Sequence, residues 1–187
     1  FICSFAKERL NIKAFMTVKK ILVEPDPFLR QKSKIVQNVD DNLRLLMDDM
    51  LETMYAAPGI GLAAIQVGVP VRVIVIDLSK EEEERKPLFF VNPKIISSSD
   101  KDSTYEEGCL SVPGQFAEID RPDKCHVKFL DYNGKPSELK AEGLLATCIQ
   151  HEIDHLEGIL FIDYLSKLKK SMIIKKLSKQ KKTSERI

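Results

Sequence analysis

Two histidines and a glutamate share one short stretch of the chain, HEIDH at residues 151–155. If this stretch is helical, His151 and His155 lie one turn apart on the same face, so both imidazoles can bind a single metal ion. Glu152 then lies about 100° round the helix from His151, where its carboxylate can handle the protons of water. The same pattern also occurs by chance in helices whose histidines only cap the helix or face solvent. A hydrolytic site of this kind needs a third protein ligand.

Known metalloproteases take their third metal ligand from a histidine or an acidic residue after the motif, and this chain has neither at the position required. The chain has three histidines, and the one outside the motif is His126. The metzincin pattern continues with a histidine where this chain has Phe161, and phenylalanine cannot bind a metal. Proteases with a glutamate ligand take it from another helix, and none of the acids that follow the motif is well placed for this: Glu157, Asp163 and Glu185. The sequence therefore argues against both protease types.

Cysteine is the remaining source of a ligand, and three cysteines come into consideration. Cys148 lies on the same predicted helix as both histidines, and three ligands crowded onto one helix give poor tetrahedral geometry. Cys125 lies in a predicted strand, where a free cysteine usually serves as a small buried apolar residue. Cys109 lies in YEEGCLSVPG, a predicted loop in which Gly108 permits close backbone approach and residues 113–114 form a turn. A thiolate in such a loop can reach the helix from outside.

The elements that must position these residues can be read from hydrophobic spacing and turn residues. The predicted elements are helices over 41–56 and 142–157, strands over 72–78 and 87–96, a hairpin over 126–143 and a last helix from about Asp163 to Lys179. The hairpin is indicated by Asn133 and Gly134, which stand between two alternating segments. Because the strands lie mostly between an early helix and the late helices, the fold class is α+β rather than alternating βαβ.

The composition is that of one ordinary globular domain. With 187 residues, 43% of them hydrophobic and 30% charged, the chain is long enough to bury a core. The longest apolar run, VIVI at 73–76, is too short to span a bilayer. Residues 1–15 are left outside the core domain, which we assign to 16–187 because Met16 is a plausible start. The four cysteines show no disulfide spacing, which favours reduced thiols and an intracellular protein.

Charge is spread unevenly along the chain. The whole chain has a net charge of +1, yet residues 163–187 carry nine Lys and Arg residues against two acidic ones. Such a basic tail is typical of a contact with a polyanion, and a solvated helix end is the alternative. Part of the tail is expected to pack on the body of the protein, because apolar residues recur at near-helical spacing: Leu165, Leu168, Met172 and Leu177.

Three motifs, in order, make the chain resemble the peptide deformylases. GIGLAAIQ at 59–66, EGCLS at 107–111 and HEIDH at 151–155 match the family patterns G-x-G-x-A-A-x-Q, E-G-C-L-S and H-E-x-D-H, and the resemblance covers roughly 16–177. The first motif also has the look of a dinucleotide-binding loop, but it follows a helix and a proline rather than a strand. The resemblance implies mixed, mainly antiparallel sheets packed around a central metal-binding helix, with an N-terminal helix and a basic C-terminal helix.

The resemblance also implies an activity. Peptide deformylases are metallohydrolases that remove the N-formyl group from the N-terminal formylmethionine of newly synthesised polypeptides and release formate. The implied roles are Cys109, His151 and His155 as metal ligands, Glu152 as general base and then acid, and Gln66 and the Leu110 backbone N–H as donors to the oxyanion. The implied physiological ion is Fe²⁺, although a thiolate and two imidazoles also suit Zn²⁺, Ni²⁺ or Co²⁺. A cytoplasmic location is expected, with an organelle as the alternative.

By the same resemblance, formyl-Met peptides bind in an apolar pocket lined by Ile60, Gly61, Tyr105, Glu107, Gly108, Leu144, Thr147 and Cys148. Leu144 alone could equally be a core residue. Phe116 stands where well-studied bacterial members have arginine, which leaves open the contacts of the second and third substrate residues. Asp154 is expected to pair with Arg121, and the basic C-terminal helix is expected to contact the ribosome.

Two other functions would share parts of this pattern. One is an inactive relative that only binds chain ends or the ribosome, and the other is an amidase or protease of broad specificity. The intact ligand set, together with Gln66, Leu110 and Glu152, argues against the inactive relative. Release of formate from a formyl-Met peptide, without cleavage of internal peptide bonds, separates the three hypotheses.

Overall fold

The computed structural model describes residues 17–184, so the predicted extension at 1–15 lies outside the described part of the chain. The strands are β1 (Gly61–Ala63), β2 (Val73–Ile76), β3 (Leu88–Ser98), β4 (Asp102–Cys109), β5 (Val112–Pro122), β6 (Lys124–Leu130) and β7 (Pro136–Glu142). The α-helices are α1 (Asp41–Ala56), α2 (Leu144–Leu156) and α3 (Lys167–Ser184), and the 3-10 helices are η1 (Pro27–Arg30), η2 (Ala64–Val67), η3 (Glu82–Glu84) and η4 (Phe161–Tyr164).

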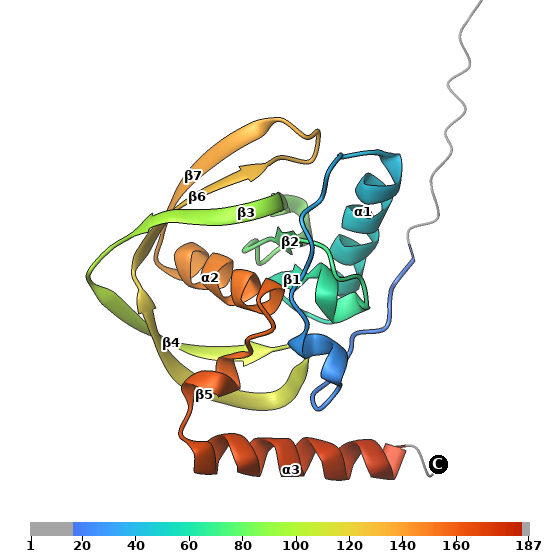
Figure 1. The fold of residues 1–187 in the computed structure, drawn as a ribbon, viewed down its shortest axis with the longest axis vertical. Coiled ribbons are helices and arrows are strands. Elements are labelled where there is room, and N and C mark those ends of the chain that lie inside the picture. Colours follow the sequence, from blue (N-terminus) through green and yellow to red (C-terminus); the bar gives the residue numbers. More distant parts are fainter. Residues whose placement is uncertain (1–16, 185–187) are drawn as a thin grey trace, which may run out of the picture.

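Helix α2 lies between two antiparallel sheets (Figure 1). The larger sheet has five strands in the order β1-β2-β3-β6-β7, and the smaller one is the hairpin β4–β5. Helix α1 covers the outer side of the larger sheet, and α3 lies beyond β5 (Figure 1). The predicted α+β class, with antiparallel sheets around a central helix and a C-terminal helix, is confirmed.

The larger sheet is covered by a helix on each face, which explains the continuous apolar run at 73–76. Val73 and Val75 pack with Met50 of α1, whereas Ile74 and Ile76 pack with α2. All five side chains are fully buried. A strand that is buried on both faces loses the usual alternation of apolar and polar residues.

The helix predicted at 41–56 and the hairpin predicted at 126–143 are confirmed as α1 and as β6–β7. The side chain of Asp40 caps α1 by accepting a hydrogen bond from the Leu43 N–H at 2.8 Å. Helix α2 begins two residues later than predicted, because Glu142 still belongs to β7 and Gly143, with a φ of 59°, turns the chain. Helix α2 is followed by Gly158 at a φ of +77°, where a Cβ atom would lie 2.4 Å from the Arg30 carbonyl oxygen.

The segment around Cys109 is not the loop that we predicted. Residues 102–122 form the hairpin β4–β5, in which Cys109 pairs with Val112 around a turn at residues 110–111. The predicted turn at 113–114 is wrong, since both residues lie in β5. Residues of β4 alternate between solvent and the inside of the fold, so the strand carries few apolar residues and gives a weak signal.

The C-terminal helix begins later than predicted, at Lys167, because η4 and an extended Leu165 come first. Leu165 and Leu177 pack on the body as expected. Leu168 and Met172 do not, since they are 72% and 63% exposed. The side of α3 that packs on the body is instead formed by Ile173, Ile174 and Leu177. No helix within residues 17–184 is long and apolar enough to cross a membrane.

Candidate metal centre

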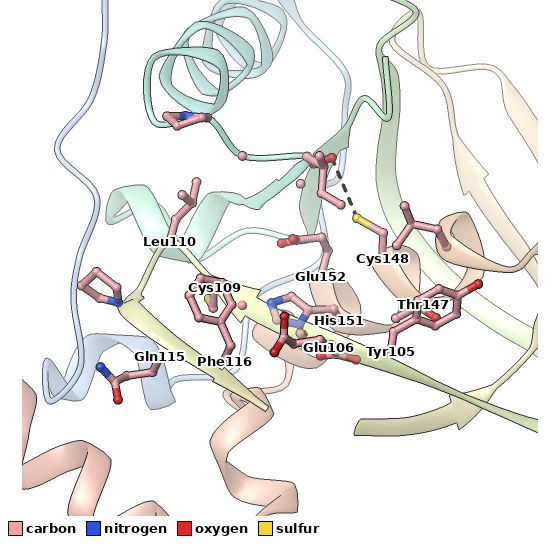
Figure 2. Close-up of a pocket in the computed structure, with 18 of the residues that line it drawn as sticks. Tyr105, Glu106, Cys109, Leu110, Gln115, Phe116, Thr147, Cys148, His151 and Glu152 are labelled. Atoms are coloured by element: carbon pink, nitrogen blue, oxygen red, sulfur yellow. Dashed lines mark hydrogen bonds and ion pairs between the residues drawn. The ribbon is translucent and has the colours of Figure 1, made fainter. Parts of the chain in front are cut away.

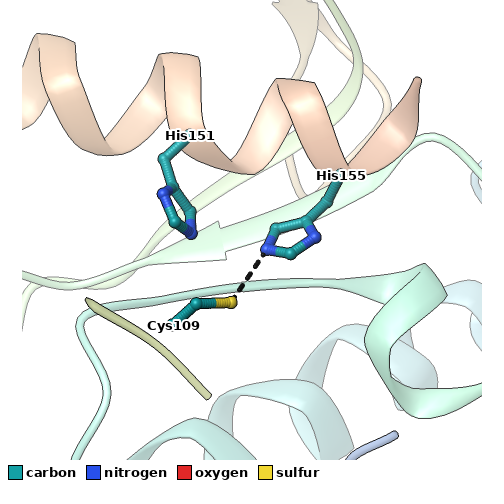
Figure 3. A group of neighbouring side chains, drawn as sticks. All are labelled: Cys109, His151 and His155. Atoms are coloured by element: carbon teal, nitrogen blue, oxygen red, sulfur yellow. Dashed lines mark hydrogen bonds between the residues drawn. The ribbon is translucent and has the colours of Figure 1, made fainter. Parts of the chain in front are cut away.

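Helix α2 and the end of β4 bring three donor atoms together (Figure 3). His151 and His155 lie one turn apart, 8% and 0% exposed, with ring centroids 5.1 Å apart. The Sγ atom of Cys109 lies 3.2 Å from Nε2 of His155. The sulfur and the two imidazole nitrogens all lie within 4.8 Å of one another. One sulfur and two nitrogens that converge from two elements fit a soft divalent ion with an open side.

The other two cysteines of the described chain are turned away from this group. Cys125 is buried between β6 and α2, and burial raises the pKa of its thiol to about 11, which favours the neutral form. Cys148 donates to the carbonyl oxygen of Ile60 at 3.8 Å, and burial raises the pKa of its thiol well above the usual value. Of the three cysteines that the sequence left open, the structure brings Cys109 to the histidines.

A chain of polar contacts fixes His151 from behind. The Glu107 Oε2 atom lies 2.7 Å from Nδ1 of His151, so the ring is held with Nε2 on the side of Cys109. The Arg121 guanidinium bonds both oxygens of Glu107 and donates to Asp154 at 2.7 Å, which confirms the predicted pair of Arg121 and Asp154. Burial on its own would raise the pKa of Glu107, but its hydrogen bonds with His151 and Arg121 lower the pKa below the usual value.

Glu107 has a second role that we did not predict from the sequence. We predicted it as a pocket residue, and it does line the pocket, but its carboxylate is engaged by His151 and Arg121. A glutamate two residues before Cys109 and on the same face of β4 gave a local signal. Its two partners are 14 and 44 residues away in sequence, however, so only the fold could reveal them.

Glu152 and Gln66 reach the centre from two further sides. Glu152 is 4% exposed, its Oε2 atom has no hydrogen-bond partner within residues 17–184, and burial raises the pKa of its carboxyl to about 7. It lies so close to Gly61 that a Cβ atom there would be 2.4 Å from Oε1. The Gln66 Oε1 atom accepts from the Ala63 N–H at 2.8 Å, and its Nε2 atom donates to Ser111 Oγ at 3.1 Å and lies 3.6 Å from the Cys109 sulfur.

A pocket of about 430 Å³ opens in front of these residues (Figure 2). All eight predicted substrate residues line it, as do Cys109, Leu110, His151, Glu152 and Gln66. Leu144 is 44% exposed, so it is a rim residue and not part of the core. Sequence reasoning missed Pro58, Gly59, Glu106, Pro113, Gly114 and Gln115 as lining residues. Phe116 covers Gly108, where a Cβ atom would lie 2.6 Å from the phenyl ring.

Such a site serves hydrolysis with the help of a metal ion. Thiolate and imidazole are ligands that suit a soft divalent cation, and a buried carboxylate without a partner is a group that can act as a base in such hydrolases. By fold and by site, the protein is therefore an α+β metal-dependent hydrolase.

Comparison with known proteins gives the family. The model of the polypeptide deformylase family matches residues 18–171, and the chain belongs to this family. The peptide deformylase of Pelagibacter ubique is 70% identical over 89% of this chain and 96% of that protein, and the one of Rhizobium meliloti is 58% identical over 90% and 97%. The crystal structure of peptide deformylase from Ehrlichia chaffeensis in complex with actinonin superposes with a TM-score of 0.85 at 47% identity and covers 88% of this chain and 98% of that one.

The predicted family and enzyme class are thereby confirmed. Peptide deformylases are metal-dependent hydrolases, and the chain shares their activity, removal of the N-formyl group from formylmethionine at the start of new polypeptides. The Cys109, His151 and His155 group is the matching feature of the structure.

Cys109→Ala is expected to abolish metal retention, because the three donor atoms converge through its sulfur. Cys148→Ala and Cys125→Ala are the matched controls, since both remove a buried thiol close to α2 that does not face the histidines. Metal content per chain, measured on purified protein by elemental analysis, should fall only in Cys109→Ala. Equal metal content in all variants and the wild type would contradict the ligand assignment.

Arg121→Ala is expected to lower the free energy of unfolding by roughly 3–5 kcal/mol, because it leaves the buried carboxylate of Glu107 and the partly buried carboxylate of Asp154 without their cation. Arg44→Ala is the control, since Arg44 pairs at 2.7 Å with the exposed Asp41. A pair of that kind contributes about 0–1 kcal/mol. Denaturant unfolding measures both losses, and a loss of the same size in the two variants would show that the buried network contributes nothing special.

Proposed function

We propose that Cys109, His151 and His155 hold the catalytic ion of this deformylase and that Fe²⁺ is its physiological identity. The convergence of the three donors beside a buried, unpartnered Glu152 is the observation that carries the proposal. Zn²⁺, Ni²⁺ and Co²⁺ suit the same donors and are expected to replace Fe²⁺ in purified protein. When bound, such an ion supplies Lewis-acid chemistry, because it lowers the pKa of water and polarises a carbonyl oxygen.

Glu152 is the group that moves the protons in this proposal. Its carboxylate takes a proton from the attacking water while the water oxygen bonds to the formyl carbon. It then gives that proton to the amine nitrogen as the carbon–nitrogen bond breaks, so that formate and a free N-terminus result. A carboxyl whose pKa is about 7 is suited to both halves of this transfer, since acid and base forms are both accessible near neutral pH.

The oxyanion donors in this proposal are the Gln66 amide and the Leu110 backbone N–H. Gln66 is 1% exposed and fixed by its bond from Ala63, so its amide is preorganised rather than free to rotate. Leu110 lies in the turn directly after Cys109 and lines the pocket. In this proposal, both donors point at the oxygen of the formyl group.

The substrate methionine is proposed to enter between β4 and α2. Leu144, Thr147 and Cys148 give α2 an apolar stripe there, because they fall at i, i+3 and i+4. The peptide backbone would run as a strand beside Ile60 and Gly108. Because this part of the pocket is apolar, it would favour a methionine side chain over a charged one.

Formate release from a formyl-Met peptide tests this assignment directly. The proposal expects formate and an otherwise intact peptide. Cleavage of internal peptide bonds would instead indicate an amidase or protease of broad specificity, and binding without formate release would indicate an inactive relative.

Glu152→Ala is expected to keep the metal ion and to lower turnover of a formyl-Met peptide about 10²–10⁴-fold, because the carboxylate handles protons and does not bind the ion. Glu157→Ala is the matched control, since that carboxylate follows α2 but pairs with Arg72 outside the pocket. Steady-state formate release and elemental analysis give the two readouts. Turnover within a few-fold of wild type in Glu152→Ala would remove the glutamate from the reaction.

We further propose that residues 16–187 form one deformylase domain, that the enzyme is cytoplasmic, with an organelle as the alternative, and that α3 contacts the ribosome. The family match over residues 18–171 supports the domain. The lysines of α3 support the ribosome contact, because phosphate-rich RNA attracts a dense basic helix.

Lys167→Glu with Lys175→Glu is expected to weaken co-sedimentation with ribosomes, most strongly at low salt, because contacts with phosphates depend on counterion release. Substitution is preferable to truncation, since Leu177 of α3 is buried in the core of the protein. Lys94→Glu with Lys140→Glu makes the same change of charge on exposed strand positions away from α3. Equal binding of both variants and the wild type across a salt series would show that α3 is only a solvated helix.

A further inference from the structure

A second cavity lies next to the substrate pocket, along the outside of β5. Its volume is about 680 Å³, and it lies between β5 and α3. Gln115 and Phe116 line both cavities, so the two adjoin at these residues. Phe116 is 65% exposed, and Figure 2 shows it at the pocket beside Gln115. We define the α3 groove as this second cavity.

The α3 groove combines an apolar floor with positive charge. Phe116 and Met172, which is 63% exposed, supply apolar surface that no other part of the described chain covers. Lys169 and Lys176 lie two turns apart on the same side of α3 and are exposed along the groove, and neither has an ion-pair partner within residues 17–184. Glu118 of β5 is the acid on the opposite wall. The groove therefore has an excess of positive charge over negative.

We propose that the α3 groove binds the downstream part of the formylated chain, from about the fourth residue onward, and favours segments with acidic side chains. This inference rests on the proposed function. A peptide whose first residue lies in the pocket beside Gly108 passes next to Phe116, which pairs with Gly108 across β4 and β5. Each further residue of an extended chain advances about 3.3–3.6 Å, so a few residues reach the lysines.

The nature of the groove favours a polypeptide as its occupant. An extended peptide presents apolar and polar side chains to opposite sides in alternation. It can therefore place apolar groups on Phe116 and Met172 and acidic groups beside Lys169 and Lys176. The remaining lysines of α3, such as Lys167 and Lys175, do not line the groove and stay available for another partner.

Kinetics with short and long substrates test the groove. The short substrate is a formyl-Met peptide of about three residues, and the long ones extend it to about nine residues with either Glu or Lys at positions five and seven. The measured quantity is the ratio of kcat/KM for a long peptide to kcat/KM for the short one. For wild type, this ratio is expected to be roughly two- to tenfold for the acidic peptide and below one for the basic peptide, as two exposed ion pairs allow.

Lys169→Glu with Lys176→Glu should reverse this preference, so that the basic long peptide gains and the acidic one loses. Lys167→Glu with Lys175→Glu, which makes the same change of charge on other sides of α3, should keep the wild-type ratio. High salt should bring the ratios for the acidic and the basic long peptides towards each other, because exposed charges are screened.

Three results would overturn the inference in distinguishable ways. No formate from the short peptide overturns the proposed function together with the groove. Formate from the short peptide, with ratios near one or with the same ratios in both double variants, overturns the groove alone. Ratios that change with enzyme concentration, together with a dimer in sedimentation that Lys169→Glu with Lys176→Glu dissolves, would show that a second copy of the chain fills the groove.

Discussion

The buried contact between Glu107 and Arg121 is the interaction on which the geometry of the centre depends. Both side chains are about 5% exposed, and they lie on neighbouring strands of the β4–β5 hairpin. From this pair, Glu107 reaches His151 and Arg121 reaches Asp154, so one ion pair ties the hairpin to two turns of α2. Cys109 is two residues beyond Glu107 on β4, and its position relative to the histidines follows from this tie.

A buried ion pair of this kind fixes the positions of its neighbours more than it stabilises the fold. Removing two charges from water costs several kcal/mol for each ion, and their attraction only offsets this when every remaining hydrogen-bonding atom is satisfied. Here, His151, Asp154 and the Tyr164 hydroxyl, which donates to Asp154 at 2.8 Å, complete the set. Apolar clusters pack on both faces of the larger sheet, and a third one packs the smaller sheet against η4 and α3.

The sequence predicted what is local and missed what depends on distant partners. Helix α1, the hairpin β6–β7 and the run at 73–76 carry their own periodicity and turn residues, and so does the HEIDH motif. The sequence predicts a loop at the β4–β5 hairpin, because its residues alternate without a marked apolar face. It also predicts that Leu168 packs on the body, whereas Ile173 and Ile174 do so instead. The choice of Cys109 over two other cysteines came from family resemblance, since no local pattern tells which strand end meets a helix.

Some of the buried polar atoms without partners lie on the helix that carries the histidines. Within residues 17–184, Thr147 Oγ1, Glu152 Oε2 and His155 Nδ1 are buried on α2 with no hydrogen bond to protein. Each such atom costs about 1–3 kcal/mol, and a protein under selection for stability alone would pair or replace it. Thr147 and Glu152 line the pocket, where water and substrate can bring the missing hydrogen bonds. The site therefore keeps polar groups that only water or substrate can satisfy, and the buried pair of Glu107 and Arg121 holds the surrounding strands and helix in place.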